Sequence, residues 1–285
     1  MRAFQPPVLA ACIVLAALLG ACGGGGDGHS VSNASASNVR LTQSTTITFN
    51  GAGLDEGVEV QVSGPCSNLQ RMGGATPTTL QYSCRVEGVG RITASAVSAD
   101  GTRVYGRLAF DVPEPRVLLA LTDGTWSGTL TLDLDARSAP QAVTQFLEYV
   151  NGGFYRDTII HRARPGVGIL GGGYVVATDG ALANKVPTRP ALPAEPSNLP
   201  RLRGAIGMVR PAGTGSANAI FFIGAADNAV FDVDAPDEVT VFGRLEGGLD
   251  VLDKVAAAEV RPDLATGLAE VPVPTVTISA ALQSR

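Results

Sequence analysis

The residue with the clearest chemical meaning in this sequence is Arg162, in the stretch 151–173, NGGFYRDTIIHRARPGVGILGGG. It follows the β-branched run 158–160 and His161, and a glycine-rich, apolar stretch comes after it. A guanidinium carries five N–H donors in a fixed planar arrangement and keeps its charge near neutral pH. Beside an apolar pocket, such a group can hydrogen-bond a peptide without any acid–base chemistry. Arg162 is therefore the first candidate for a functional side chain.

Short strands and two helices must position this arginine. Alternating apolar residues predict strands at 117–121, 130–134 and 276–282. Ser138 with Gln141 three residues later is typical of a capping box and predicts a helix start. Apolar residues at helical spacing continue this helix as far as the stop at 151–153, and a second helix is predicted over 249–258.

The order and spacing of many further residues indicate a family. These residues are Ala139-Pro140, Val143, Phe146, Tyr149-Val150, Gly153-Phe154-Tyr155, Thr158, Ile160-His161-Arg162, Pro165-Gly166, Gly171-Gly172, Arg203-Gly204, Met208, Phe221-Phe222-Ile223, Ala226-Asp227-Asn228, Asp232 and Val241-Phe242-Gly243. With them, the chain from Val117 to Leu282 resembles the cyclophilins, which are peptidyl-prolyl cis-trans isomerases, and the bacterial periplasmic members above all.

This resemblance implies a mainly β fold, a closed eight-stranded antiparallel barrel with two capping helices. It also implies that the proline-rich segment 187–200 is a long loop, although such a segment can serve as a recognition ligand. Proline-containing polypeptides are the expected partners. The resemblance gives Arg162 the catalytic role and Phe222 the floor of the proline pocket. The other positions that it implies for substrate binding are Val167, Leu170, Met208, Val209, Ile220, Val230 and Phe231.

Several of these positions differ from the family pattern. Val167, Gly168 and Leu170 stand where the family usually has Phe, Met and Gln, and Ile220 replaces a second Gln. Apolar side chains cannot form the hydrogen bonds of those amides, and Gly168 is expected to open space. We expect a weak isomerase that assists the folding of exported proteins. The alternatives are a non-catalytic peptide- or protein-binding module of the cell envelope, and an envelope scaffold in which the N-terminal β domain makes the important contact. The scaffold requires a groove that is closed or filled by Arg164 or Arg210.

Other chemistries find little support in the sequence. The net charge is −5 and no basic cluster is present, so nucleic acid is not an expected partner. The stretch 166–171 fits the pattern G-x-G-x-x-G, but the glycines at 171–173 oppose the helix that a dinucleotide site requires. No His/Cys cluster has metal-ligand spacing. We therefore expect neither a metal nor a cofactor.

The first 22 residues predict export. Arg2 precedes an apolar run at 8–19, which is too short for a spanning helix, and small residues lead to Cys22. The segment resembles a bacterial lipoprotein signal, which implies that Cys22 becomes the lipidated N-terminus; an ordinary secretory signal is the alternative. Gly23 in place of Asp favours the outer membrane, with the protein facing the periplasm. The lipid anchor is expected to be the only membrane attachment. The protein is expected to be a monomer.

Three further segments follow the predicted signal peptide. Residues 23–38 are rich in Gly, Ser and Asn and predict a flexible linker. Residues 39–114 contain short alternating runs separated by turn residues, which predicts a small immunoglobulin-like β domain. Its Cys66 and Cys84 form an even pair in an exported chain and predict a disulfide, with two free thiols as the alternative. Residues 115–285 are the predicted isomerase domain.

Overall fold

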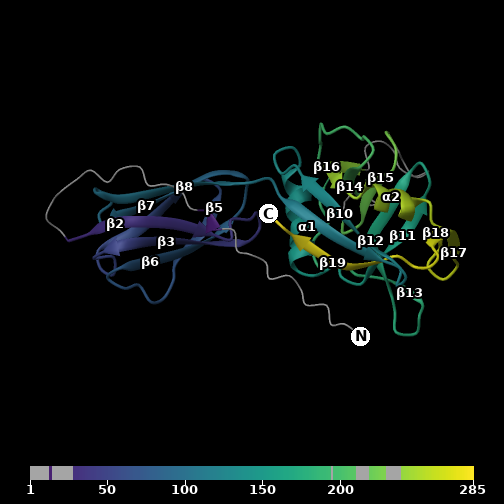
Figure 1. Ribbon diagram of the computed structural model, residues 1–285, viewed down its shortest axis with the longest axis horizontal. Helices are drawn as coiled ribbons and strands as arrows, with labels where there is room; N and C mark the ends of the chain where they lie inside the picture. The colour runs from purple at the N-terminus through teal and green to yellow at the C-terminus, as the bar shows by residue number, and fades with distance from the viewer. Residues whose placement is uncertain (1–12, 15–27, 194, 210–217, 229–238) are drawn as a thin grey trace. The chain divides into compact units, whose positions relative to one another are not determined.

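The computed structural model describes residues 13–14, 28–193, 195–209, 218–228 and 239–285 of the chain (Figure 1). It divides into two compact units, Met1–Pro113 and Glu114–Arg285. The division falls inside the Pro113-Glu114-Pro115 segment. Proline fixes the backbone on both sides of Glu114, so this segment suits a boundary between units.

The first unit consists of two antiparallel sheets around one core. One sheet has the order β1 (Ile13–Val14), β2 (Ser30–Ser37), β3 (Ser44–Ala52), β6 (Thr79–Val86) and β5 (Cys66–Arg71). The other has the order β4 (Val58–Ser63), β7 (Gly90–Ser98) and β8 (Val104–Val112). Alternate residues of both sheets, among them Phe49, Ile92 and Phe110, form a single buried cluster. The described unit is therefore a small β sandwich.

Two features of this unit bear on the predictions. The linker predicted over 23–38 is wrong in its second half, because β2 pairs with β3 along its length and buries Val31, Ala34 and Ala36. Small side chains are enough for a strand whose neighbour supplies the bulky apolar residues. Cys66 on β5 and Cys84 on the neighbouring strand β6 form a disulfide, with 5.7 Å between their Cα atoms.

The second unit is a closed barrel of eight antiparallel strands. The strands follow one another around the barrel as β11 (Thr158–Arg164), β19 (Thr277–Gln283), β9 (Arg116–Thr122), β10 (Ser127–Leu134), β16 (Val239–Gly247), β14 (Ala205–Val209), β15 (Phe221–Gly224) and β12 (Gly168–Val176). Pairing of β11 with β12 closes the ring, and β13 (Leu182–Asn184) adds to the other edge of β12. A separate hairpin, β17 (Val260–Asp263) and β18 (Leu268–Pro272), lies next to β11 (Figure 1). The expected eight-stranded barrel is confirmed.

The two helices are α1 (Pro140–Asn151) and α2 (Leu249–Ala256). Phe146 of α1 contacts the aromatic rings of Tyr155, Phe221 and Phe242, so this helix is fixed by the barrel core. No described helix has the length and hydropathy needed to cross a bilayer.

The start of α1 differs from the predicted capping box. Ser138 bonds Asp135 instead of the helix, and Ala139 is the N-cap residue, without a side-chain cap. The backbone N–H groups of Gln141 and Ala142 donate to the carboxylate of Glu195, at 2.9 and 2.8 Å. A negative group satisfies these unpaired donors and suits the positive end of the helix dipole. The cap therefore comes from the loop around 187–200, which the local pattern could not reveal.

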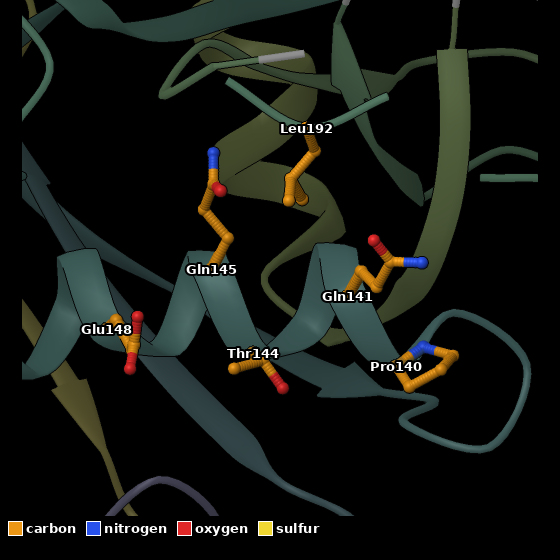
Figure 2. A pocket seen from close by; sticks show the side chains of 6 residues that line it. All are labelled: Pro140, Gln141, Thr144, Gln145, Glu148 and Leu192. Atoms are coloured by element: carbon orange, nitrogen blue, oxygen red, sulfur yellow. The ribbon is translucent and has the colours of Figure 1, made fainter. Parts of the chain in front are cut away.

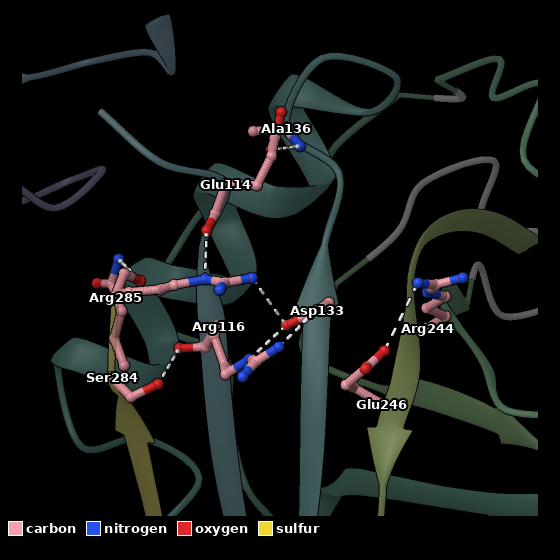
Figure 3. Close-up of polar contacts among 9 residues, drawn as sticks. Glu114, Arg116, Asp133, Ala136, Arg244, Glu246, Ser284 and Arg285 are labelled. Atoms are coloured by element: carbon pink, nitrogen blue, oxygen red, sulfur yellow. Dashed lines mark hydrogen bonds and ion pairs between the residues drawn. The ribbon is translucent and has the colours of Figure 1, made fainter. Parts of the chain in front are cut away.

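The end of the chain is fastened to the barrel by charged side chains (Figure 3). Arg116 donates through Nε and Nη2 to Asp133 at 2.6 and 2.8 Å. Arg285 donates to the same carboxylate at 3.2 Å and to the backbone oxygen of Glu114 at 3.1 Å. These contacts hold β19, β9 and β10 together at one end of the ladder.

Candidate functional site

Arg162 belongs to a row of residues that crosses three strands of the barrel. It lies on β11 opposite Leu170 of β12, and Leu170 lies opposite Phe222 of β15. Directly opposite residues of antiparallel strands point to the same face of a sheet. The barrel therefore places Arg162, Leu170 and Phe222 on one face, with the charged group at one end of the row and the aromatic ring at the other.

An apolar cluster surrounds the aromatic end of this row. Leu170, Val209 and Phe222 are buried together, and the half-buried Val167 and Ile220 pack against them. These are five of the residues predicted to bind substrate. Phe222 as a whole residue is only 5% exposed, so its neighbours cover most of its surface. An apolar surface of this kind can hold a proline ring by burial.

The remaining predicted residues do not join this cluster in the described structure. Met208 lies opposite Phe221, the neighbour of Phe222, and is fully buried with it. Since successive strand residues point to opposite faces, Met208 faces the barrel interior instead of the row. The positions predicted at Val230, Phe231, Arg210 and Cys22 lie outside the described residues.

The space expected at Gly168 is not present. A Cβ atom at this position would lie 2.2 Å from the backbone oxygen of Ile223 and 3.0 Å from the ring of Phe222. The φ angle of Gly168 is +147°, which side chains rarely tolerate. The glycine therefore permits close contact between β12 and β15, and the expectation of an opened pocket is wrong.

The partner of Arg162 is a residue that the sequence analysis missed. Nε of Arg162 donates to Oε2 of Glu270 on β18 at 2.7 Å, and Nε of Arg164 donates to Oε1 of the same carboxylate at 2.7 Å. The side chains of Arg162 and Glu270 are 17% and 19% exposed. No local motif identifies Glu270, because 108 residues separate it from Arg162. Its one visible signal is that it is the single acidic residue of the short strand Leu268–Pro272.

The electrostatics of the site follow from this cluster of three charges. Burial alone would raise the pKa of Glu270, but hydrogen bonds from Arg164 and Arg162 lower it below its ordinary value. Glu270 is therefore ionised at neutral pH, and two guanidinium groups share one carboxylate.

His161, next to Arg162 in the chain, is buried and uncharged at neutral pH. Burial lowers its pKa to about 4, and the charge of Arg162 acts in the same direction. Its ring lies against Tyr174 with 4.9 Å between centroids, and its Nδ1 has no hydrogen-bond partner in the described part of the chain. His161 is a neutral framework residue.

A separate hollow of about 320 Å³ lies along α1 (Figure 2). Leu192 and five residues of the helix line it: Pro140, Gln141, Thr144, Gln145 and Glu148. None of them was predicted to bind substrate. Among the described residues, no group of His, Cys, Asp or Glu side chains is arranged to hold a metal ion.

Comparison with known proteins supports the resemblance. The profile of the family described as "Cyclophilin type peptidyl-prolyl cis-trans isomerase/CLD" matches residues 118–282. "Peptidyl-prolyl cis-trans isomerase A" of Dickeya dadantii is 35% identical over 170 residues, which are 59% of this chain and 85% of the relative. "Peptidyl-prolyl cis-trans isomerase B" of Escherichia coli is 31% identical over 139 residues, which are 47% of this chain and 82% of the relative.

A solved cyclophilin-type isomerase of Cryptosporidium parvum, crystallised in the presence of the dipeptide Ala-Pro, aligns with a TM-score of 0.44 and 21% identity. The alignment covers 59% of this chain and 98% of that chain.

The family profile spans more than half of the chain, and the relatives are matched over most of their length. The closed barrel with two helices agrees with this assignment. The chain belongs to the cyclophilin-type peptidyl-prolyl cis-trans isomerases and is an isomerase of this type.

Proposed function

We propose that Arg162 and the apolar cluster around Phe222 form the active site of an isomerase that acts on X–Pro bonds of exported proteins, with an efficiency below that of ordinary cyclophilins. The observation that carries this proposal is the row Arg162–Leu170–Phe222, which places a charged donor and a buried aromatic ring on one face of the barrel, two strands apart. A relative was crystallised with Ala-Pro, and proline-containing polypeptides are the substrates that we infer for this chain.

The chemistry requires only binding of a twisted peptide bond. Resonance gives the C–N bond double-bond character, and the barrier to rotation is about 18–20 kcal/mol. The two isomers of an X–Pro bond differ by only about 0.5–1 kcal/mol, so a catalyst must lower the barrier alone. A donor near the prolyl nitrogen weakens the resonance, and binding the twisted form better than either planar form accelerates the reaction. In this proposal Arg162 is the donor, and the cluster holds the proline ring.

The reduced efficiency is inferred from Leu170 and Ile220. Both lie in the apolar cluster at positions where amides would hydrogen-bond the peptide. An apolar wall contributes about 25 cal/mol for each Å² that it buries, but it does not fix the peptide carbonyls. The twisted state therefore gains little beyond what the planar states gain.

A protease-coupled assay of prolyl isomerisation tests this proposal. The purified full chain and "Peptidyl-prolyl cis-trans isomerase B" of Escherichia coli are compared on one proline-containing peptide, at equal concentrations of folded protein. We expect a kcat/KM above the uncatalysed background and below that of the relative. A rate equal to the background would refute catalysis, and a rate equal to the relative's would refute the reduced efficiency.

One observation favours a second function, peptide binding without catalysis. Phe222 is covered by Leu170 and Val209, and Arg162 is already paired with Glu270. A groove of this kind can bind apolar segments without stabilising a twisted bond. Calorimetric titration with a proline-containing peptide distinguishes the two functions, because this alternative requires binding in the absence of any rate above background.

We further propose that the protein is anchored through Cys22 to the outer membrane and faces the periplasm. This proposal rests on the sequence of residues 1–22 and on Gly23. In a bacterial host, labelled palmitate should enter the wild-type protein and not the Cys22→Ser variant, and membrane fractionation should recover the wild type with the outer membrane. Recovery of an unlabelled wild-type protein in the soluble periplasmic fraction would refute the anchor.

A further inference from the structure

We propose that Glu270 is a positioning residue that holds the guanidinium of Arg162 in the orientation needed for isomerisation. This inference rests on the proposed catalytic role of Arg162. It assigns to the β17–β18 hairpin a function that the family resemblance of the Arg162 region did not indicate.

An arginine that acts on one bond of a substrate must be held in place. Its side chain has several rotatable bonds, and fixing them costs conformational entropy. Leu170 lies directly opposite Arg162 on the neighbouring strand, but its side chain has no hydrogen-bonding group. A carboxylate of another element, Glu270 on β18, does bond this guanidinium.

The contact between Glu270 and Arg162 has the geometry of such a restraint. It joins Oε2 to Nε at 2.7 Å, and Nε is the guanidinium nitrogen nearest to the backbone. Because the guanidinium is planar, fixing Nε restricts the plane and direction of the whole group. Both side chains are more than four-fifths buried, so water competes weakly for this hydrogen bond.

Arg164 completes the arrangement. It lies two residues after Arg162 on β11, where side chains share a face, and it donates through Nε to the second oxygen of Glu270. Each carboxylate oxygen therefore has its own arginine, which fixes the rotation of the carboxylate. The group of two arginines and one glutamate retains a net positive charge, so Arg162 is oriented without the charge of the site being cancelled.

The strand that carries Glu270 is itself well fixed. Asp263 at the end of β17 accepts hydrogen bonds from the backbone N–H and the hydroxyl of Thr266, at 2.8 and 2.6 Å, and thereby closes the turn. Val271, the next residue after Glu270, is buried, and β18 lies against β11. The hairpin thus presents the carboxylate from a rigid element, as positioning of a functional side chain requires.

The test compares Glu270→Ala with Glu259→Ala in the full chain. Glu259 precedes the same hairpin, and its side chain forms an exposed ion pair with Arg261, so this control removes the same charge from the same region. We expect Glu270→Ala to lower kcat/KM on the order of tenfold, mainly through kcat, because a misplaced catalytic group stabilises the transition state less. Glu259→Ala should leave kcat/KM unchanged, and circular dichroism verifies equal folded fractions.

A second-site variant distinguishes positioning from general support of the fold. Leu170→Gln in the Glu270→Ala background supplies an amide directly opposite Arg162. We expect it to raise kcat by a larger factor in this background than in the wild type, because the amide then replaces the missing restraint on Arg162; an element that only stabilises the barrel predicts the same factor in both backgrounds. If Glu270→Ala does not fold, Glu270→Gln keeps one acceptor oxygen for two arginines and should still lower kcat/KM, whereas the matched Glu259→Gln should leave it unchanged.

The outcomes separate this inference from the function on which it rests. Activity that depends on Arg162 but is unchanged in Glu270→Ala would overturn the role of Glu270 alone. Equal losses in Glu270→Ala and Glu259→Ala, or the same factor of increase from Leu170→Gln in the wild-type and Glu270→Ala backgrounds, would also overturn it. A wild-type chain whose rate equals the background would overturn both the proposed function and this inference.

Discussion

Restoring two amides beside Arg162 should raise the isomerase activity. In the double variant Leu170→Gln, Ile220→Gln, each new side chain can hydrogen-bond the peptide or the guanidinium. The net contribution of one hydrogen bond to the free energy of an interaction is about 0.5–1.5 kcal/mol. If both are made mainly in the twisted state, the barrier falls by about 1–3 kcal/mol, which corresponds to an increase in kcat/KM of roughly 5- to 150-fold.

The same substitutions are expected to destabilise the fold. Leu170 is 8% exposed within an apolar cluster, and an amide placed there without a partner costs about 1–3 kcal/mol. Denaturant unfolding measures this cost, and the protease-coupled assay is run where both proteins are fully folded. The matched control is Leu170→Met, Ile220→Met, which preserves size and adds no amide. A decrease or no change in kcat/KM of the folded amide variant would show that the cluster serves binding instead of isomerisation.

Three further predictions concern stability. Mass spectrometry of unreduced peptides from envelope protein should show Cys66 linked to Cys84, and replacing both by Ser should lower the free energy of unfolding by about 3 kcal/mol; two alkylatable thiols would contradict this. Burial lowers the pKa of His161 to about 4 from 6.5, so between these values only the unfolded chain gains a proton. Denaturation should show the free energy of unfolding falling by up to about 3 kcal/mol as the pH drops through this range, and His161→Gln should flatten the slope; an unchanged slope would exclude His161 as its source. Gly168→Ala should lower the thermal midpoint more than Gly166→Ala, because both have positive φ but only Gly168 has a backbone oxygen within 2.2 Å of the new Cβ; equal shifts would contradict this reasoning.

The sequence predicted the parts of the fold that depend on order and periodicity. Alternation and helical spacing predicted several strands and both helices, whereas the barrel and the apolar cluster near Arg162 were implied only by the family resemblance over 117–282. The alternation of apolar and polar residues in short runs also predicted the β unit before Pro113. Register then explains why Met208 was misassigned: strand alternation places it on the face opposite Phe222, and a motif match alone does not specify the face.

Long-range polar contacts were beyond the reach of the sequence. Glu195 caps α1 from more than 50 residues away, and Glu270 reaches Arg162 from a hairpin near the end of the chain. In both cases a single carboxylate finds its donors only after the barrel has closed. The strand β2 was missed for a different reason, because Val31, Ala34 and Ala36 offer too little apolar surface to mark a strand without its neighbour.

The central claim is that Arg162 supplies the charged donor for isomerisation. The most direct test compares kcat/KM of Arg162→Ala with that of Arg164→Ala at equal folded fractions, since both variants remove one of the two arginines bound to Glu270. We expect Arg162→Ala to lose on the order of 100-fold, as removal of a transition-state donor does, and Arg164→Ala to lose much less. Wild-type activity in Arg162→Ala, or equal losses in both variants, would contradict the claim.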